Sequence, residues 1–397
     1  MGDVLVIGGG IAGPATALAL QRAGLDGIEV FEAQPEGGAD AGAFLTLAGN
    51  GVFALDQFGA AGLLDPLGFP VLRMSVLGAD GSALAEDVPL GDAGDPLTHY
   101  RCLRRAELAR ALREEAVRRG IPVRHGARLT GIAPDDSGES VTALFADGGS
   151  ATGRLLVGAD GLRSAVRAAL SPDAPDAAPA YAGQQVYYGY TDQADPPHRD
   201  SARITMVRGS GAAFGYLVSP AGEALWFARV PGPPLGPEEL AGNGPDDWRR
   251  RLLPLLAGDR TPAAGLVAAT GAELMATNAW QLTPGLVWRG PRTVLIGDAA
   301  HAASPATGQG ASMALEDAVV LAKALRELPV RQALPRFEEL RRPRVERNIE
   351  VSGALTARRP ADRGPVADAE RGSRGPVTRL DPELRELLDW GRQLPTR

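Results

Sequence analysis

Gly8-Gly9-Gly10-Ile11-Ala12-Gly13 follows an apolar run, Asp3 to Ile7, and has the spacing G-x-G-x-x-G. A helical pattern over 14–23 comes next, and a second apolar run ends at Glu32, nineteen residues beyond Gly13. Strand, glycine turn, helix, strand and acid occur in this order in dinucleotide-binding folds. The sequence therefore predicts a Rossmann-like α/β unit that binds a nucleotide.

Each part of this turn has a separate expected role. Gly8 permits the tight turn, Gly10 lets the backbone approach a pyrophosphate, and Gly13 lets the helix pack closely on the sheet. The helix start at Ile11-Ala12 favours negative charge. Glu32 is placed to bind the hydroxyl pair of an adenosine ribose, and an acid there predicts FAD or NAD rather than NADP.

Two further stretches combine an apolar run with glycine and acid. Gly297-Asp298-Ala299-Ala300-His301 follows the run 293–296, and Pro305 and Gly308-Gln309-Gly310 come after it. The acid can accept hydrogen bonds from a polyol, and glycines that open a helix let backbone N–H groups approach an electron-rich ring. Gly158-Ala159-Asp160-Gly161 follows the strand pattern 154–157; taken alone, it would also suit a simple strand-to-helix turn.

Composition limits the classes of function. A chain of 397 residues with 44% hydrophobic residues predicts two domains with a sizeable core. The net charge of −7 disfavours nucleic acid as a partner. Cys102 is the single cysteine, and the four histidines lack metal-ligand spacing, so no metal site is expected. No apolar run approaches the roughly 20 residues of a membrane span, and no secretion signal precedes the first strand, which predicts a cytoplasmic protein without membrane contact.

The middle of the chain predicts a second domain. Strand patterns at 184–192, 202–208, 213–219 and 224–230 indicate an antiparallel sheet, to which a hairpin at 71–81 is added. Helical spacing at 246–257 predicts a helix on the outer side of this sheet, and an amphipathic helix is predicted at 103–119. One face of the sheet would bind substrate, with Tyr187, Tyr188, Tyr190, Phe214, Tyr216, Trp226 and Phe227 as candidates. Because side chains alternate, about half can face inward, and ordinary packing is the alternative for each.

The three glycine stretches, in this order and at these separations, resemble the single-component FAD-dependent aromatic hydroxylases, the group of para-hydroxybenzoate hydroxylase, salicylate hydroxylase and the tetracycline-inactivating monooxygenases. In that family, Gly158 to Arg167 corresponds to the DG motif and Gly297 to Gly310 to the GD motif. Arg105-Ala106-Glu107-Leu108 is similar to the family's Arg-x-x-Leu helix start, and 337–348 to its carboxy-terminal helix. The resemblance spans about residues 3 to 350.

The resemblance implies roles for individual residues. Glu32 would bind the adenosine ribose, Arg105 the pyrophosphate and Asp298 the ribityl chain. Asp160 would belong to a segment that serves both FAD and the incoming NADPH or NADH. Pro305, Gly308, Gln309 and Gly310 would lie beside the isoalloxazine. His301 could act as a base towards a phenol, but a structural role at the helix start is the favoured interpretation.

The resemblance also implies the domain plan and the reaction. Residues 1–72, 100–178 and 285–345 would form the FAD-binding domain, 73–99 and 179–284 the substrate domain, and 346–397 carboxy-terminal helices and a tail. NAD(P)H would reduce FAD, and O₂ would give a C4a-hydroperoxyflavin that passes one oxygen to an aromatic or polyketide-like molecule, in secondary metabolism or antibiotic biosynthesis. Because the flavin performs the chemistry, no catalytic triad or metal is expected. The protein would be a monomer or homodimer. Alternatives are a flavin reductase or dehydrogenase without oxygen insertion, and a non-catalytic FAD-binding protein.

Overall fold

A parallel sheet carries the predicted nucleotide-binding unit. The computed structural model describes residues 3–35, 43–134, 138–172, 178–194, 200–357 and 380–395. The sheet has the strand order β18-β12-β1-β2-β8, and all its pairings are parallel. Its strands are β1 (Val4–Ile7), β2 (Ile28–Phe31), β8 (Val123–Arg124), β12 (Leu155–Gly158) and β18 (Thr293–Leu295). Ile7 pairs with Gly158, and Gly158 with Leu295, so the three glycine stretches begin at one edge of the sheet.

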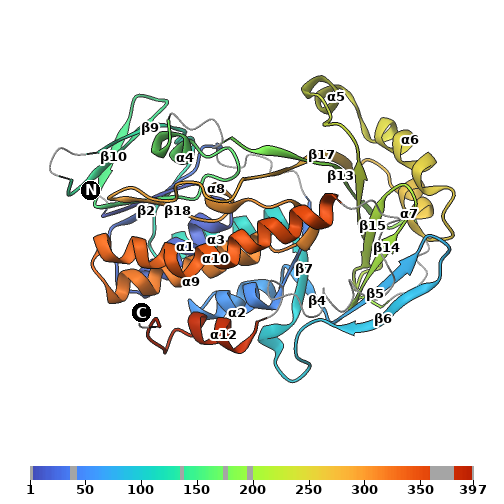
Figure 1. The fold of residues 1–397 in the computed structure, drawn as a ribbon, viewed down its shortest axis with the longest axis horizontal. Helices are drawn as coiled ribbons and strands as arrows, with labels where there is room; N and C mark the ends of the chain where they lie inside the picture. The colour runs from blue at the N-terminus through green and yellow to red at the C-terminus, as the bar shows by residue number, and fades with distance from the viewer. Residues whose placement is uncertain are drawn as a thin grey trace.

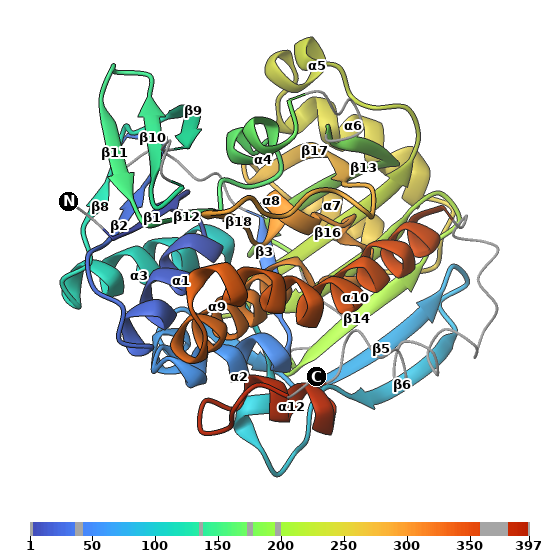
Figure 2. The same ribbon diagram turned by 60° about the vertical axis from the view of Figure 1, so that its left-hand side comes forward.

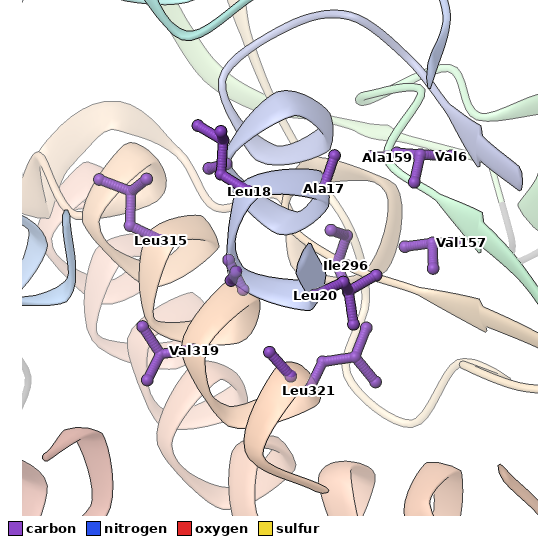
Figure 3. Packing of buried hydrophobic residues seen from close by; sticks show 14 of the residues in the cluster. Val6, Ala17, Leu18, Leu20, Val157, Ala159, Ile296, Leu315, Val319 and Leu321 are labelled. Carbon is purple, nitrogen blue, oxygen red and sulfur yellow. The ribbon is translucent and has the colours of Figure 1, made fainter. Parts of the chain in front are cut away.

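Helices cover one side of this sheet. The helix α9 (Gly310–Glu327) packs against α1 (Ala12–Arg22), α2 (Gly49–Gln57) and α10 (Val330–Ala357), with α3 (Arg105–Arg118) beside α1 (Figures 1 and 2). Leucines and valines of α1 and α9 interlock with those of β1 and β12 in one fully buried core (Figure 3). Burial of this apolar surface is the main stabilising term for the domain.

Short elements cover the other side of the parallel sheet and connect its strands. The antiparallel strands β9 (Leu129–Pro134), β10 (Val141–Phe145) and β11 (Ser150–Gly153) lie there, and Phe145 stacks on Phe31 with ring centroids 4.9 Å apart. Two short helices, α4 (Ala165–Leu170) and α8 (Asp298–His301), follow β12 and β18, while the 3₁₀ turns η1 (Ala61–Leu64), η2 (Pro96–Thr98) and η4 (Pro305–Thr307) contact the helical layer.

The second sheet differs from the predicted one in two respects. Its order is β17-β13-β16-β15-β14-β5-β6, and it includes the strand β17 (Leu274–Gln281), which the sequence pattern did not predict. The other strands are β13 (Ala180–Thr191), β16 (Ala224–Pro231), β15 (Ala213–Val218), β14 (Arg203–Arg208), β5 (Arg73–Gly78) and β6 (Ala83–Pro89). The pair β14–β5 is parallel, whereas the other pairs are antiparallel. The long stretch of chain between β5 and β14 allows the crossover that a parallel pair needs. The helices α5 (Pro237–Gly242), α6 (Pro245–Leu256) and α7 (Ala263–Ala269) lie on the far side of the sheet from the parallel-sheet domain (Figure 1).

A small antiparallel sheet joins the two domains. It consists of β3 (Phe44–Leu47), β7 (Tyr100–Arg104) and β4 (Gly68–Val71) in the order β3-β7-β4. Leu103 and Arg104 belong to β7, so the helix predicted from 103 begins only at Arg105. Cys102 is buried in an apolar cluster between the domains.

The carboxy-terminal part continues the helical layer. The helix α10 runs without interruption through Pro335 and Pro343, so the expected boundary between residues 345 and 346 falls inside it. The short helix α12 (Pro382–Leu388) packs on α2 and α9. Residues 358–379 of the expected carboxy-terminal tail lie outside the described residues. Within the described part of the chain, no helix is long and apolar enough to cross a bilayer, and no cluster of side chains could hold a metal ion.

Candidate cofactor and substrate site

The first glycine turn leaves space for a ligand at one position only. A Cβ atom built on Gly8 would lie 2.3 Å from the carbonyl oxygen of Ala159, and one on Gly13 would lie 1.9 Å from the carbonyl oxygen of Gly8. Both glycines are therefore required by contacts within the protein. A Cβ atom on Gly10 would meet no protein atom within 4 Å. The open space beside Gly10 agrees with its predicted role beneath a pyrophosphate.

A cavity of about 270 Å³ lies beside this turn. Gly8, Gly10, Glu32 and Asp160 all line it, so the structure brings these four predicted residues together. Glu32 Oε2 accepts a hydrogen bond from the backbone N–H of Gly9 at 2.6 Å, and its Oε1 accepts from Gln34 at 2.7 Å. Each carboxylate oxygen keeps a second lone pair that can accept from a ribose hydroxyl.

Asp160 has a role that the sequence did not suggest. Its carboxylate accepts hydrogen bonds from Ser164 Oγ at 2.5 Å and from the backbone N–H groups of Ala165 and Val166 at 2.7 and 3.1 Å. Burial raises the pKa of Asp160, although these hydrogen bonds act in the opposite direction. Asp160 therefore holds the first turn of α4 at the wall of the cavity.

Two arginines whose contacts the sequence did not indicate connect the motifs. Arg167 donates from Nη1 to the carbonyl oxygen of Ala299 at 2.8 Å and from Nη2 to that of Leu162 at 2.6 Å, which ties the second glycine stretch to the third. Arg113 donates from Nη1 to the carbonyl oxygen of Gly9 at 2.7 Å. The available signal for Arg167 in the sequence was its place at the end of the DG motif, and the structure shows that it is buried.

Arg105, the predicted pyrophosphate ligand, does not line the cavity. It is exposed at the start of α3, and its backbone N–H donates to the carbonyl oxygen of Ala43 at 3.0 Å. Its positive charge lowers the pKa of the Tyr188 hydroxyl in the second sheet, against the effect of burial. Arg113, two turns further along α3, contacts the glycine turn directly.

The third glycine stretch forms a turn that presents one acid. Gly297 has a φ of 56°, and a Cβ atom on it would lie 3.1 Å from Cβ of Ala12, so the turn sits against the start of α1. Asp298 is exposed although Gly297 and Ala299 beside it are buried. Its Oδ1 would lie 3.7 Å from a Cβ atom on Gly310 and thus points to the first residue of α9.

The residues predicted beside the flavin ring surround the same helix start. Pro305, Gly308 and Gly310 are exposed, whereas Gln309 is buried and accepts a hydrogen bond from Asn50 Nδ2 at 3.0 Å. Asn50 is fully buried, and its Oδ1 has no hydrogen-bond partner among the described residues. Free backbone N–H groups at a helix start favour negative charge on a nearby group.

Three of the seven aromatic candidates face the parallel-sheet domain, which is the predicted cofactor domain. Tyr188, Tyr190 and Phe227 lie on the inner face of the second sheet, each with its ring centroid 6.1 to 6.3 Å from that of Phe44. Tyr188 and Phe227 retain partial exposure. Arg229, on the same face, places its guanidinium 5.8 Å from the ring of Phe227. Burial raises the pKa of Tyr188, against the charges of Arg229 and Arg105.

The structure corrects the expectation for the other four aromatic residues. Tyr187, Phe214, Tyr216 and Trp226 are at most 1% exposed and form the core between the second sheet and the outer helices. Tyr187 packs edge-on against Trp248 of α6, and Trp226 stacks on Phe214. They point away from the cofactor domain because side chains alternate along each strand.

The surroundings of His301 suit the structural role that the sequence favoured. It is 3% exposed, and its Nε2 lies 2.6 Å from Asp317 Oδ2. The same oxygen accepts a hydrogen bond from the backbone N–H of Gly297 at 2.9 Å. Burial opposes ionisation of Asp317, but His301 and Arg341 outweigh it and lower the pKa of Asp317 to about 2.

Comparison with known proteins identifies the family. The family model described as "FAD binding domain" matches residues 1–223 and 246–352. The chain belongs to the FAD-dependent aromatic hydroxylases. It is 32% identical to an aurachin C monooxygenase/isomerase of Stigmatella aurantiaca, over 88% of this chain and 87% of that one. It is 31% identical to a 3-amino-4-hydroxybenzoate 2-monooxygenase of Streptomyces cremeus, over 86% and 84%.

A solved structure supports the same assignment and the fold. The urate-bound HpxO of Klebsiella pneumoniae, complexed with FAD, superposes with a TM-score of 0.77 at 27% identity and covers 97% of this chain and 93% of that one. The predicted fold class is confirmed: a Rossmann-like FAD-binding domain with an added sheet domain.

The residues present fit FAD. The open backbone at Gly10 lies just before α1, the fixed carboxylate of Glu32 directly after β2, and the exposed Asp298 at the start of α8, so all three follow strands of the parallel sheet. A pyrophosphate, a ribose and a polyol are the chemical groups that these features recognise. When bound, FAD supplies the redox chemistry, and the protein supplies position and electrostatics.

Proposed function

We propose that this protein is an NAD(P)H- and O₂-dependent FAD monooxygenase that hydroxylates an aromatic or polyketide-like small molecule. One oxygen atom of O₂ would enter the substrate, the other would leave as water, and NAD(P)H would supply the two electrons. The observation that carries the proposal is the inner face of the second sheet, where Tyr188, Tyr190 and Phe227 meet Phe44 of the cofactor domain.

The chain's own residues would perform binding and exclusion of water. Aromatic rings on the inner face provide a flat apolar surface on which an aromatic substrate can stack. Arg229, 5% exposed on this face, would attract an anionic or electron-rich group of the substrate. The helix start at Gly310 would stabilise negative charge on the reduced ring system.

The related proteins support an aromatic substrate and a role in secondary metabolism. One relative is a 3-amino-4-hydroxybenzoate 2-monooxygenase, HpxO is complexed with uric acid, and a third is an aurachin C monooxygenase/isomerase. We propose the same broad class for this chain, with antibiotic biosynthesis or modification as the setting.

The test combines cofactor content with oxygen transfer. Purified protein should carry FAD, and its oxidation of NADH or NADPH under air should accelerate with amino- and hydroxybenzoates or quinolones as candidate substrates. With ¹⁸O₂, the product should gain one labelled oxygen atom. A hydrogenated product formed equally well without O₂ would instead indicate a reductase. Bound FAD without oxidation of either nicotinamide cofactor would favour the non-catalytic alternative.

A further inference from the structure

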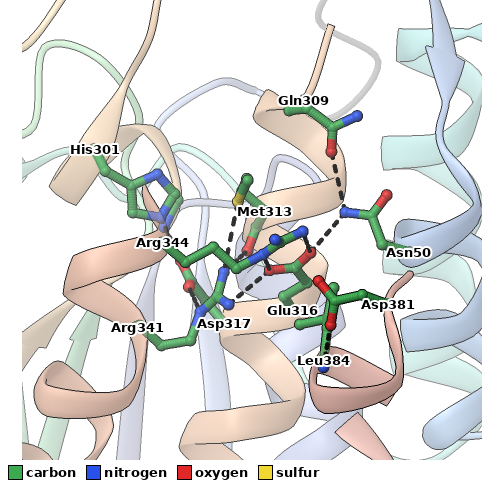
Figure 4. A network of polar contacts seen from close by, with 11 residues as sticks. Asn50, His301, Gln309, Met313, Glu316, Asp317, Arg341, Arg344, Asp381 and Leu384 are labelled. Atoms are coloured by element: carbon green, nitrogen blue, oxygen red, sulfur yellow. Dashed lines mark hydrogen bonds and ion pairs between the residues drawn. The ribbon is translucent and has the colours of Figure 1, made fainter. Parts of the chain in front are cut away.

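A buried network of charges lies beneath the candidate flavin site (Figure 4). Glu316, Asp317 and Arg341 are each 0% exposed. Arg341 bridges the two acids: its Nη1 lies 2.6 Å from Glu316 Oε2, and its Nε donates to Asp317 Oδ1 at 2.7 Å. Ionised groups in an apolar core need such compensation, because each loses its hydration on folding.

Asp317 reaches one of the two turns that face the cofactor. Its Oδ2 accepts from the backbone N–H of Gly297 at 2.9 Å and from His301 Nε2 at 2.6 Å. Gly297 immediately precedes Asp298, whose carboxylate is the predicted ligand of the ribityl chain. One buried carboxylate therefore holds both ends of α8, the helix that presents this ligand.

Glu316 reaches the other turn. Its Oε1 accepts from Asn50 Nδ2 at 2.6 Å, and the same nitrogen donates to Gln309 Oε1 at 3.0 Å. Arg344 adds a two-pronged pair, with its Nε 2.9 Å from Glu316 Oε2 and its Nη2 3.0 Å from Oε1. Gln309 immediately precedes Gly310, the first residue of α9, so Glu316 fixes the helix start predicted beside the ring.

We propose that Glu316 and Asp317 are positioning residues, each of which fixes one of the two cofactor-facing turns. Arg341 of α10 fixes the positions of the two acids relative to each other. Asp317 positions Asp298 and thereby governs FAD affinity. Glu316 positions the helix start at Gly310 and thereby governs the electronic environment of the bound ring. This inference rests on the proposed FAD site and adds a function for the consecutive acids of α9.

The first test substitutes Asp317 and Glu316 separately. For Asp317→Asn we expect the dissociation constant of FAD to rise about tenfold or more, because the amide cannot accept from Gly297, His301 and Arg341 together. For Glu316→Gln we expect a smaller loss of affinity but a shifted visible spectrum and reduction potential of bound FAD at full saturation. If Glu316 acted only in folding, its substitution would change neither the visible spectrum nor the reduction potential of the protein saturated with FAD.

Two gentler variants protect the test from loss of folding. Asn50→Leu leaves every ion pair of the network intact, and His301→Gln removes only the contact of His301 with Asp317 while the arginine pairs stay in place. These two variants should reproduce, more weakly, the effects of Glu316→Gln and Asp317→Asn respectively. Arg342→Lys is the matched control, since Arg342 is the next residue of α10 but pairs with the partly exposed Glu338 and Glu346, outside the network.

The outcomes distinguish this inference from the proposed function. Wild-type protein that binds no FAD would overturn both. Wild-type protein that binds FAD, with all four network variants matching Arg342→Lys in affinity, spectrum and potential, would overturn the positioning role and leave the proposed function intact. If Asp317→Asn and Glu316→Gln lowered FAD affinity equally and changed neither the spectrum nor the potential, the separate roles of the two acids would be overturned.

Discussion

At the scale of single residues, Gly10 and Gly13 share one turn but have different tasks. Gly10→Ala adds a methyl group where no protein atom lies within 4 Å, so the free energy of unfolding of the FAD-free protein should remain unchanged. FAD affinity should fall about tenfold, because the methyl group occupies the approach to the pyrophosphate. Gly13→Ala should instead cost about 1–3 kcal/mol of stability, since its methyl group would overlap the carbonyl oxygen of Gly8.

Urea unfolding of the FAD-free proteins and fluorescence titration with FAD measure the two effects independently. A destabilised Gly10→Ala protein, or one with wild-type FAD affinity, would contradict the assignment of this position to the ligand. The contrast requires both variants, because each is the control for the other.

Residue roles could be predicted from the sequence where they depend on nearby positions. Glu32 and Gly10 line the same cavity, as their spacing after two apolar strands predicted. The contacts of Arg113 and Arg167 were missed, because each bonds a backbone carbonyl more than 100 positions away along the chain. Helical periodicity identifies a face but gives no information about such a partner.

At the scale of elements, β16 alternates between two environments. Phe227 faces the cofactor domain, while Trp226 stacks on Phe214 and donates from Nε1 to Thr270 Oγ1 at 2.9 Å in the outer core. Trp226→Ala should therefore lower the free energy of unfolding by about 3–5 kcal/mol. Phe227→Ala should leave most of the stability but lower kcat/KM for an aromatic substrate about tenfold.

Calorimetry and steady-state kinetics on both variants check this division of the strand. If Trp226→Ala lowered kcat/KM and Phe227→Ala lowered only stability, the faces would be assigned the wrong way round. The sequence predicted that about half of the aromatic residues face inward, but the direction depends on α6 and α7 covering the other face, which no strand pattern contains.

The helix α12 is held by the chain's only lysine. Lys323 of α9 is fully buried, and its Nζ donates to the carbonyl oxygens of Leu387 and Asp389 at 2.6 and 2.7 Å, at the end of α12 where such groups lack helical partners. Burial lowers the pKa of Lys323 to about 8. The charged groups nearest to it are Glu327, Arg326, Asp389 and Glu386.

This arrangement predicts a pH dependence of stability. Because Lys323 is less basic in the folded protein than its ordinary value of 10.5, the unfolded chain binds more protons between pH 8 and 10.5. Stability from this group therefore rises with pH across that window. Relative to Lys323→Met, wild-type protein should gain stability from pH 8 upward, as measured by urea unfolding at several pH values. A constant difference between the two proteins would show that the ammonium group is not desolvated as the structure indicates.

At the scale of the whole molecule, function depends on how the two sheets meet. The sequence predicted both sheets, since strand alternation and glycine turns are local signals. It did not predict the joint, which is built from three distant segments: β3, β4 and β7. Phe44 of β3 supplies the ring around which Tyr188, Tyr190 and Phe227 gather, so the joint also forms one wall of the proposed substrate site.

Arg104 makes ion pairs and a cation–π contact across this joint and thereby clamps the two domains together. It lies at the end of β7, pairs with Glu223 at 3.2 Å and Glu273 at 3.0 Å in the second-sheet domain, and places its guanidinium 3.9 Å from the ring of Tyr190. Charge pairs, a cation–π contact and the apolar cluster around Cys102 thus act at one place. Loss of Arg104 should loosen the joint while each domain keeps its own core.

Arg104→Met should therefore lower coupling more than folding. Water that enters a loosened joint would divert electrons from the substrate, so more hydrogen peroxide should appear per NAD(P)H oxidised. Arg101→Met is the matched control, because Arg101 lies on the same strand but pairs with the exposed Asp65. Peroxide yield measured at saturating substrate should rise several-fold for Arg104→Met and stay at the wild-type level for Arg101→Met. If both variants released equal peroxide, the contacts of Arg104 would have no part in shielding the site.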